Sequence, residues 1–465
     1  MAEEKNDRAG RTAIGRRSRL WMVAMTGTLI MQGCQADTAE LNSPAGRAAN
    51  GAATAKIATK EPTSKSSSGA GNDSGDARNS DTRPESTDND APAERESFAQ
   101  WLEEFRAYAR SQGINTAVLD EALGDISYQP RIIELDRYQP EFTRAIWQYL
   151  DSAVSASRIK NGRAKLAAHR ETAEGVEERY GVPSSVVTAI WGVESNYGSN
   201  FGSFSTVEAL ATLGYEGRRH EFAREQLIAA LKIIQRDDID ASHMRGSWAG
   251  AMGHTQFIPT SFLAYAVDGD DDGRRDIWGS IPDVMASTAN YLERNGWRRG
   301  EPWGAEVRLP ENFDYARADA DIRMSTARWR ELGVRGVGRE PLPVLDDAAI
   351  IAPAGAQGPI FMVGHNFRVI MRYNNATSYA LAVAILSDRI NGRPGVQASW
   401  PRDLEPLSRS QTRELQQALN RAGFDTGTPD GIMGPNTRGA LRAWQRSRGE
   451  TPDGFATVET LERLR

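Results

Sequence analysis

The polar segment of residues 35–97 constrains the fold most, because it cannot contribute to a hydrophobic core. It contains no Phe, Trp, Tyr, Val or Met, and its only large aliphatic residues are Leu41 and Ile57. A segment of this composition buries too little apolar surface to offset the entropy that it would lose on ordering. We therefore predict a disordered linker over residues 34–97, and a folded chain that begins at Phe98.

A charged and then apolar stretch precedes this linker. Six basic residues lie within residues 5–19, and twelve apolar or small residues follow, from Leu20 to Met31. This order is typical of a secretory signal and is too short to span a bilayer, so we predict a signal peptide over residues 1–33. Gly33-Cys34 at its end resembles a bacterial lipoprotein signal, which implies lipidation of Cys34 and a location at the periplasmic face of the outer membrane. An ordinary signal peptide with an incidental cysteine is the alternative.

Composition excludes several classes of protein. The chain has 465 residues, enough for about three domains, and no apolar run reaches the roughly 18 residues of a membrane-spanning helix. Its single cysteine rules out an intrachain disulfide or a cysteine-based zinc site. The net charge of −6 does not suit a protein that binds nucleic acid, and we expect no such partner.

The pattern after Phe98 predicts a mainly α fold. Apolar residues recur at helical spacing through Leu150, again over residues 160–235, and in Tyr379–Ile390. Short runs rich in β-branched residues predict a few strands, namely Glu306–Leu309, Ala349–Ala352 and Ile360–Met371. Gly and Pro at residues 391–395 predict a boundary.

One carboxylate lies in an otherwise apolar helical pattern. Pro183 suits the first turn of this predicted helix and Gly198 suits its end. Val187, Ile190 and Glu194 share one face, because they are spaced by three and four residues. Burial raises a carboxyl pKa, and a carboxylic acid that is protonated near neutral pH can act as a general acid. Glu194 is therefore either catalytic or a buried structural glutamate.

A second segment, Gly246–Phe262, combines small residues with Trp, Met, Gln and Phe. Small residues permit close approach of the backbone, and the larger ones offer apolar surface and an amide to a sugar. A Gly-Ala-rich packing turn is the structural alternative.

Three segments together carry a resemblance: Ile190–Gly198, Gly246–Phe262 and Tyr373–Tyr379. In this order they resemble the lytic murein transglycosylase B family, glycoside hydrolase family 103, from about Phe98 to Ile390. The resemblance implies a lysozyme-like catalytic domain with a small β portion over residues 98–392.

The resemblance also implies a reaction. The family cuts the bond between N-acetylmuramic acid and N-acetylglucosamine without water, and a 1,6-anhydro ring forms. Glu194 would act first as acid and then as base, with no cofactor. Other positions match cleft residues of the family: Ser247, Gln256, Tyr373, Asn374 and Tyr379. Tyr373 and Tyr379 are candidates to hydrogen-bond Glu194 or to stack on sugar rings.

An arginine pair matches a further position of the family. Arg218 and Arg219 would bind the acidic peptide stem of peptidoglycan, and a solvated helix start is the alternative.

An Asp-rich loop has the spacing of the beginning of an EF-hand. Its carboxylates lie at positions 1, 3, 5 and 9, with glycine at position 6 and a backbone carbonyl at position 7: Asp268, Asp270, Asp272, Asp276, Gly273 and Arg274. Position 12 is Gly279, so the usual bidentate glutamate is missing, and an ordinary turn is the alternative. The family has a calcium loop here, which implies a structural Ca²⁺.

The C-terminal block repeats itself. Asp430-Gly431 and Asp453-Gly454 are 23 residues apart, and each precedes a Thr and a Leu at the same offsets. The block resembles the type 1 peptidoglycan-binding domain, a three-helix unit, over residues 408–465, which leaves a linker over residues 393–407.

These observations predict an exported, monomeric lytic transglycosylase that binds peptidoglycan glycan strands and is anchored to the membrane through Cys34. Two alternatives stay open at this stage: a muramidase that uses water, and a wall-binding protein without catalytic activity.

Overall fold

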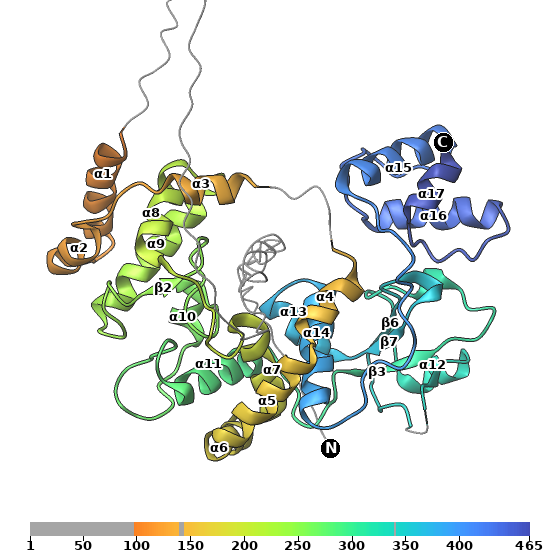
Figure 1. Ribbon diagram of the computed structural model, residues 1–465, viewed down its shortest axis with the longest axis horizontal. Coiled ribbons are helices and arrows are strands. Elements are labelled where there is room, and N and C mark those ends of the chain that lie inside the picture. The colour runs from red at the N-terminus through yellow and green to blue at the C-terminus, as the bar shows by residue number, and fades with distance from the viewer. Residues whose placement is uncertain (1–96, 139–143, 339–340) are drawn as a thin grey trace, which may run out of the picture.

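The computed structural model describes residues 97–138, 144–338 and 341–465 (Figure 1). The predicted signal peptide, Cys34 and nearly all of the predicted linker lie outside the described residues. None of the helices in the described ranges has the length and apolarity needed to cross a membrane.

The first helix of the described residues begins at Phe98, where the sequence predicts a helix. Ser97 caps this helix: its hydroxyl accepts a hydrogen bond from the Gln100 backbone N–H, and the Gln100 side chain accepts one from the Ser97 N–H. Trp101 and Phe105 are buried on its inner face. Five helices form this end of the molecule: α1 (Phe98–Ser111), α2 (Thr116–Leu123), α3 (Pro130–Arg137), α8 (Thr206–Glu216) and α9 (His220–Gln235).

The central part of the molecule is also helical, and its middle helix is α7 (Ser184–Ser195). Ten of the twelve residues of α7 are buried, because it packs against helices on several sides. The surrounding helices are α4 (Ile146–Ala153), α5 (Ala156–Ala168), α6 (Arg170–Tyr180), α10 (Pro259–Tyr265), α11 (Ile281–Arg294), α13 (His365–Tyr373) and α14 (Thr377–Ile390). The strands β1 (Phe204–Ser205) and β2 (Arg245–Gly246) pair beside them.

The small β portion is an antiparallel sheet of five strands in the order β4-β6-β7-β3-β5. Its strands are β3 (Gly304–Arg308), β4 (Arg323–Met324), β5 (Arg335–Gly336), β6 (Ala348–Ile351) and β7 (Ile360–Val363). The short helices η1 (Tyr315–Arg317), α12 (Thr326–Glu331) and η2 (Gly355–Gln357) connect them. Trp329 is completely buried against this sheet.

One predicted strand is wrong in its second half. The sequence predicts a strand over Ile360–Met371, but β7 ends at Val363 and α13 begins at His365. Gly364 separates the two elements. After it, Phe367 and Ile370 are buried at a spacing of three residues, which is the periodicity of a helix and not of a strand. Burial of one helix face thus overrode the β-branched composition.

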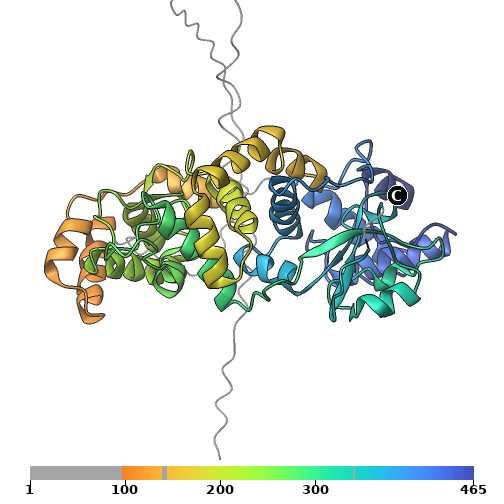
Figure 2. The same cartoon turned by 90° about the horizontal axis from the view of Figure 1, so that it is seen from below.

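The C-terminal module is a separate small core at the other end of the molecule from α1 and α2 (Figure 2). It consists of α15 (Arg409–Arg421), α16 (Pro435–Ser447) and α17 (Val458–Leu464). Leu415, Leu419, Leu441 and Trp444 form its interior.

Candidate functional site

Glu194 lies in the last turn of α7, where the chain leaves the helix in an unusual conformation. Asn196, Tyr197 and Gly198 all have positive φ, of 48°, 60° and 82°. This conformation is costly for residues other than glycine and is common near functional sites. A Cβ at Gly198 would lie 2.3 Å from the His254 ring, so glycine is required there. The backbone thus brings Glu194 against the second sequence motif.

The Glu194 carboxyl group makes one hydrogen bond within the described part of the chain. The hydroxyl of Tyr379, in the first turn of α14, donates to Glu194 Oε1 at 2.6 Å. Glu194 Oε2 is buried and has no hydrogen-bond partner among the described residues. The residue as a whole is half-buried, so its carboxyl group lies deep in the site while part of the side chain is accessible. Tyr379, and not Tyr373, is therefore the hydrogen-bond partner of Glu194.

Burial raises the pKa of Glu194 to about 8, and the Tyr379 hydrogen bond opposes this shift. No carboxylate of the described residues contributes to the shift. Glu194 is therefore an acid that is protonated at neutral pH and held by a tyrosine.

Aromatic side chains form one wall of the site. The rings of Tyr373 and Tyr379 stack, with centroids 6.4 Å apart, and Tyr291 lies 4.7 Å from Tyr373. The Tyr373 hydroxyl donates to the Thr255 carbonyl oxygen at 2.7 Å. Burial and the charge of Glu194 raise the pKa of Tyr373 well above its usual value of 10. The phenols remain neutral. Tyr379 is buried and holds Glu194, whereas Tyr373 is half-buried, so its ring can offer a flat apolar surface to a sugar.

Tyr149 on α4 also lies close to Glu194. Its pKa is raised, first by burial and then by the negative charge of Glu194. It comes from a helix 45 residues upstream of the glutamate, outside the three motifs. No pattern in the sequence indicated this residue.

His254 joins the second motif to α7. Its Nδ1 accepts a hydrogen bond from the indole N–H of Trp191 at 3.1 Å, and the two rings stack with centroids 5.8 Å apart. Its backbone carbonyl accepts the hydroxyl of Ser195 at 2.9 Å. Burial lowers the pKa of His254 to about 4, and Lys165 adds to the effect, so the ring is neutral. No pattern in the sequence indicated a role for His254.

Ser247 and Gln256 shape the loop between these contacts. The Ser247 hydroxyl is buried and accepts the backbone N–H groups of Ala249 and Ala251. The Gln256 amide donates to the carbonyls of Phe201 and Gly253, at 3.0 and 2.9 Å. Both side chains therefore brace the backbone around the site.

Asn374 ends α13, and its carbonyl accepts the Ala376 N–H at 2.8 Å, so the chain turns at once into α14. This turn sets Tyr373 and Tyr379 on neighbouring helices that face the same glutamate.

The arginine pair lies at the junction of α8 and α9. Arg218 forms an ion pair with the buried Asp136 of α3 at 3.4 Å. The guanidinium of Arg219 lies 4.3 Å from the centre of the Phe222 ring. Both arginines are exposed. Arg218 thus tethers α3, while its surface still faces solvent.

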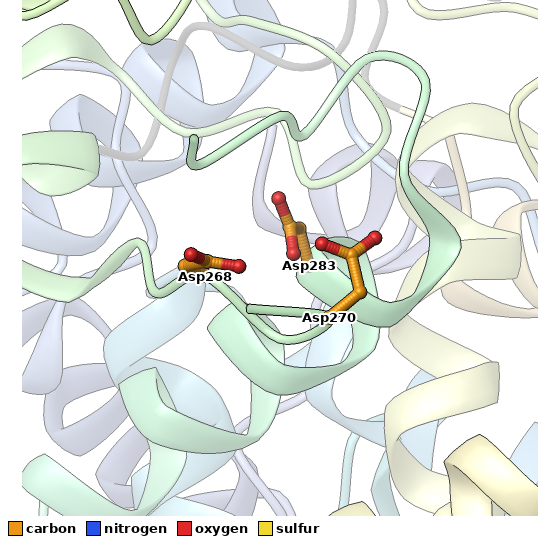
Figure 3. A group of neighbouring side chains, drawn as sticks. All are labelled: Asp268, Asp270 and Asp283. Atoms are coloured by element: carbon orange, nitrogen blue, oxygen red, sulfur yellow. The ribbon is translucent and has the colours of Figure 1, made fainter. Parts of the chain in front are cut away.

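The Asp-rich loop gathers three carboxylates (Figure 3). Asp268 and Asp270 bring ligand atoms within 4.8 Å of each other and of Asp283, which lies in the first turn of α11. Asp272 and Asp276 do not belong to this group, and each accepts hydrogen bonds from nearby backbone N–H groups.

Asp283 is completely buried. Its two oxygens accept the N–H groups of Gly269 and Asp276, each at 2.6 Å. The pKa of Asp283 is raised to about 6, mainly by burial and in smaller part by the charges of Asp270 and Asp268, while the two backbone hydrogen bonds oppose the shift. Three crowded carboxylates suit a hard cation such as Ca²⁺. The sequence missed Asp283 because it lies beyond the loop, in the following helix.

A cavity of about 670 Å³ lies elsewhere and is lined by α1, α9 and α10, with Trp101, Tyr108, Arg224 and Lys232. Thr260, near the end of the motif Gly246–Phe262, lines it, but Glu194 does not. The candidate active site therefore follows from the chemistry around Glu194 and not from this cavity.

Comparison with known families covers both parts of the folded chain. Residues 97–388 match the Transglycosylase SLT domain family, and residues 408–464 match a peptidoglycan binding domain family.

Individual relatives agree with these matches. Membrane-bound lytic murein transglycosylase B from Escherichia coli (strain K12) is 28% identical over 292 residues, which cover 61% of this chain and 76% of the relative. SltB3 from Pseudomonas aeruginosa was solved in complexes with NAG-anhNAM-pentapeptide and NAG-NAM-pentapeptide. These structures are 51% identical, with a TM-score of 0.77, and cover 79% of this chain and 99% or 100% of theirs. Escherichia coli Slt35 in complex with calcium is 26% identical, with a TM-score of 0.54, and covers 62% of this chain and 92% of its own.

Proposed function

Because the chain belongs to the SLT-domain transglycosylase family and is a lytic transglycosylase of peptidoglycan, we propose that Glu194 is its single catalytic acid and base. The observation that carries this proposal is the Glu194 carboxyl group, with its pKa raised to about 8, one oxygen held by Tyr379 and the other unpartnered.

The reaction begins with a proton transfer. Protonated Glu194 gives its proton to the glycosidic oxygen between N-acetylmuramic acid and N-acetylglucosamine, and the bond from this oxygen to C1 of the muramic acid breaks. The glutamate is then a carboxylate, and the Tyr379 hydroxyl stabilises its charge.

The same carboxylate completes the reaction. It accepts the proton of the muramic acid C6 hydroxyl while the C6 oxygen bonds to C1, which closes the 1,6-anhydro ring and restores the acid. No water enters, and the atoms of the two products sum to those of the substrate. The NAG-anhNAM fragment bound by SltB3 supports this product.

The first experiment digests murein sacculi with the full chain in detergent and with Glu194→Gln, and weighs the released muropeptides. We expect products one water lighter than those of a muramidase, and a loss of at least about 1,000-fold in rate for the variant, since an amide cannot donate the proton that the leaving oxygen needs.

Two other outcomes would contradict the proposal. Hydrated products would identify a muramidase and require a second carboxylate near Glu194. Absence of products from the folded wild-type chain would favour a wall-binding protein without catalytic activity.

We also propose that Asp268, Asp270 and Asp283 hold a structural Ca²⁺. Their separation and charge support this, as does the calcium complex of Slt35. Asp272, Asp276 and the Arg274 carbonyl complete the predicted EF-hand set. The ion would neutralise carboxylates that otherwise repel one another across the loop, and it takes no part in the reaction.

The position of the enzyme in the envelope is the last part of the proposal. The relative from Escherichia coli is membrane-bound, and Cys34 follows a signal-like segment, so we propose a lipid anchor on Cys34 at the periplasmic face of the outer membrane. We further propose that the enzyme acts as a monomer. Arg218 and Arg219, which are exposed between α8 and α9, would bind the stem peptide of the substrate.

A further inference from the structure

The C-terminal module contains two copies of one hydrogen-bonded unit. In the first copy, Gln416 of α15 holds the turn that contains Asp430 and Gly431: its amide donates to Asp430 Oδ1 at 2.9 Å, and its carbonyl accepts the Gly431 N–H at 2.8 Å. Asp430 Oδ1 also accepts the N–H of Ile432 at 2.8 Å.

The second copy repeats these bonds one helix later. The amide of Gln445, on α16, donates to Asp453 Oδ1 at 2.8 Å, and its carbonyl accepts the Gly454 N–H at 2.8 Å. Asp453 Oδ1 accepts the N–H of Phe455 at 3.0 Å. An arginine precedes the glutamine by three residues in both helices: Arg413 in α15 and Arg442 in α16. The two turns therefore present equivalent faces, formed by the arginine, the aspartate and the apolar residue after the glycine.

The second face is occupied by the catalytic body. Asp453 Oδ2 accepts the backbone N–H of Ala356, in η2, at 2.9 Å. Phe455 packs in an apolar cluster with Trp147 and Trp400. Arg442 is half-buried, and the carboxylates of Asp314 and Asp319 lie near enough to influence its pKa. This face thus contacts a backbone amide and an apolar cluster of the catalytic body, with two carboxylates of that body nearby.

The first face is exposed. Arg413 and Asp430 are both accessible, and Ile432 is 57% exposed, one of few large apolar side chains so exposed among the described residues. Arg409 and Arg438 lie beside the same turn: a Cβ on Gly431 would contact Arg409, and the Arg438 guanidinium donates to the Met433 carbonyl. Three arginines against one aspartate give this face a positive charge.

We infer that the face formed by Arg413, Asp430 and Ile432 binds the acidic stem peptides of peptidoglycan. A stem peptide offers groups of the kinds that the catalytic body offers to the second face: backbone amides, apolar side chains and carboxylates. The positive charge of the face complements those carboxylates. The inference rests on the proposed function, because it assumes that the wall is the substrate, and it adds the place where the module holds the wall.

The test measures binding of the full chain to murein sacculi by co-sedimentation, in a Glu194→Gln background so that the wall is not digested. Arg413→Ala and Ile432→Ala, each added singly, should weaken binding about tenfold, since each removes one anchor of the face. Arg446→Ala is the matched control, because it removes the same charge from an exposed position at the end of α16. It should bind as the parent does.

A second arm identifies the ligand. Sacculi stripped of stem peptides by an amidase should bind the parent about tenfold more weakly, and the Arg413→Ala variant should lose nothing further. Equal binding to intact and stripped sacculi, or equal binding by Arg413→Ala and the control, would overturn the inference. A parent chain that dimerises, and that Ile432→Ala makes monomeric without changing wall binding, would also overturn it. That result would assign the face to a second copy of the chain.

The inference and the proposed function can fail separately. The same single substitutions in the Glu194 chain should leave the cleavage rate of a soluble NAG-NAM oligomer without stem peptides unchanged, together with the melting temperature. If the chain releases anhydro products but Arg413→Ala and Ile432→Ala do not change sacculus binding, only the inference about this face is refuted.

Discussion

At the scale of single residues, one hydrogen bond joins the proposed catalytic acid to a side chain 185 residues away in the sequence. The Tyr379 hydroxyl lowers the pKa of Glu194, while burial raises it to about 8. The balance leaves the carboxyl group protonated at neutral pH but able to release its proton to a leaving group.

Tyr379→Phe tests this balance. Loss of the donor should lower kcat about tenfold, because the carboxylate formed during the reaction loses a hydrogen bond worth roughly 1.5–3 kcal/mol. The alkaline limb of the pH profile should move to higher pH, because the hydrogen bond favoured the ionised form. Tyr373→Phe is the control: it loses its bond to Thr255 and should leave that limb in place.

The buried acid also makes stability depend on pH. Between its unfolded pKa, near 4.5, and its folded pKa of about 8, the folded chain binds a proton that the unfolded chain does not. The free energy of unfolding should therefore fall as pH rises through this window, by an amount on the order of 3 kcal/mol. Glu194→Gln should remove this contribution. Chemical denaturation at pH 4.5 and pH 8 measures it, and an identical pH dependence in both proteins would show that Glu194 is not buried as an acid.

At the scale of elements, the loop before α11 and the first turn of that helix bring three carboxylates together. Asp283 is buried in the first turn of α11, and Asp268 and Asp270 come from the loop. A cation would join loop and helix, whereas without one the three carboxylates repel each other.

Calcium should therefore stabilise the chain. At saturation we expect the melting temperature to rise on the order of 5 °C with calcium and to change much less with magnesium, which prefers a smaller octahedral site. Asp270→Asn should raise about tenfold the calcium concentration needed for half of this stabilisation, because it removes one ligand charge. Asp271→Asn, whose residue has positive φ and lies outside the group, is the matched control. No response to calcium in the wild-type chain would count against the site.

At the scale of the whole molecule, the catalytic body lies between the two proposed attachments to the envelope. The C-terminal module is docked on the body through the turn at Asp453, and its equivalent turn at Asp430 faces solvent. The proposed anchor precedes the folded chain by more than sixty residues. One end would hold the membrane and the other the wall, which keeps the local substrate concentration high.

Cys34→Ser tests the anchor. Without the thiol no lipid can be attached, so the protein should move from the membrane fraction to the soluble periplasmic fraction, while the specific activity of the purified enzyme on sacculi stays the same. Fractionation followed by immunoblotting measures this. An unchanged membrane fraction would show that another feature holds the protein there.

The sequence by itself determined what depends on local patterns. Helical spacing predicted α1, α7 and α14, and an apolar helix face singled out Glu194, because periodicity and turn chemistry act over a few residues. The repeated Asp-Gly turns predicted the C-terminal module for the same reason. The resemblance of the three motifs implied the family, which the match to residues 97–388 confirmed.

The tertiary structure decided which distant side chains meet. Tyr149, His254 and Asp283 carry no local signal, since each reaches its site through packing of helices and loops far apart in the chain. The helix at His365–Tyr373 formed where β-branched residues favoured a strand, because burial of one face outweighed propensity. Only the docked position of Phe455 showed that one of two equivalent turns is covered and the other is exposed. Such contacts depend on long-range packing, which no short stretch of sequence encodes.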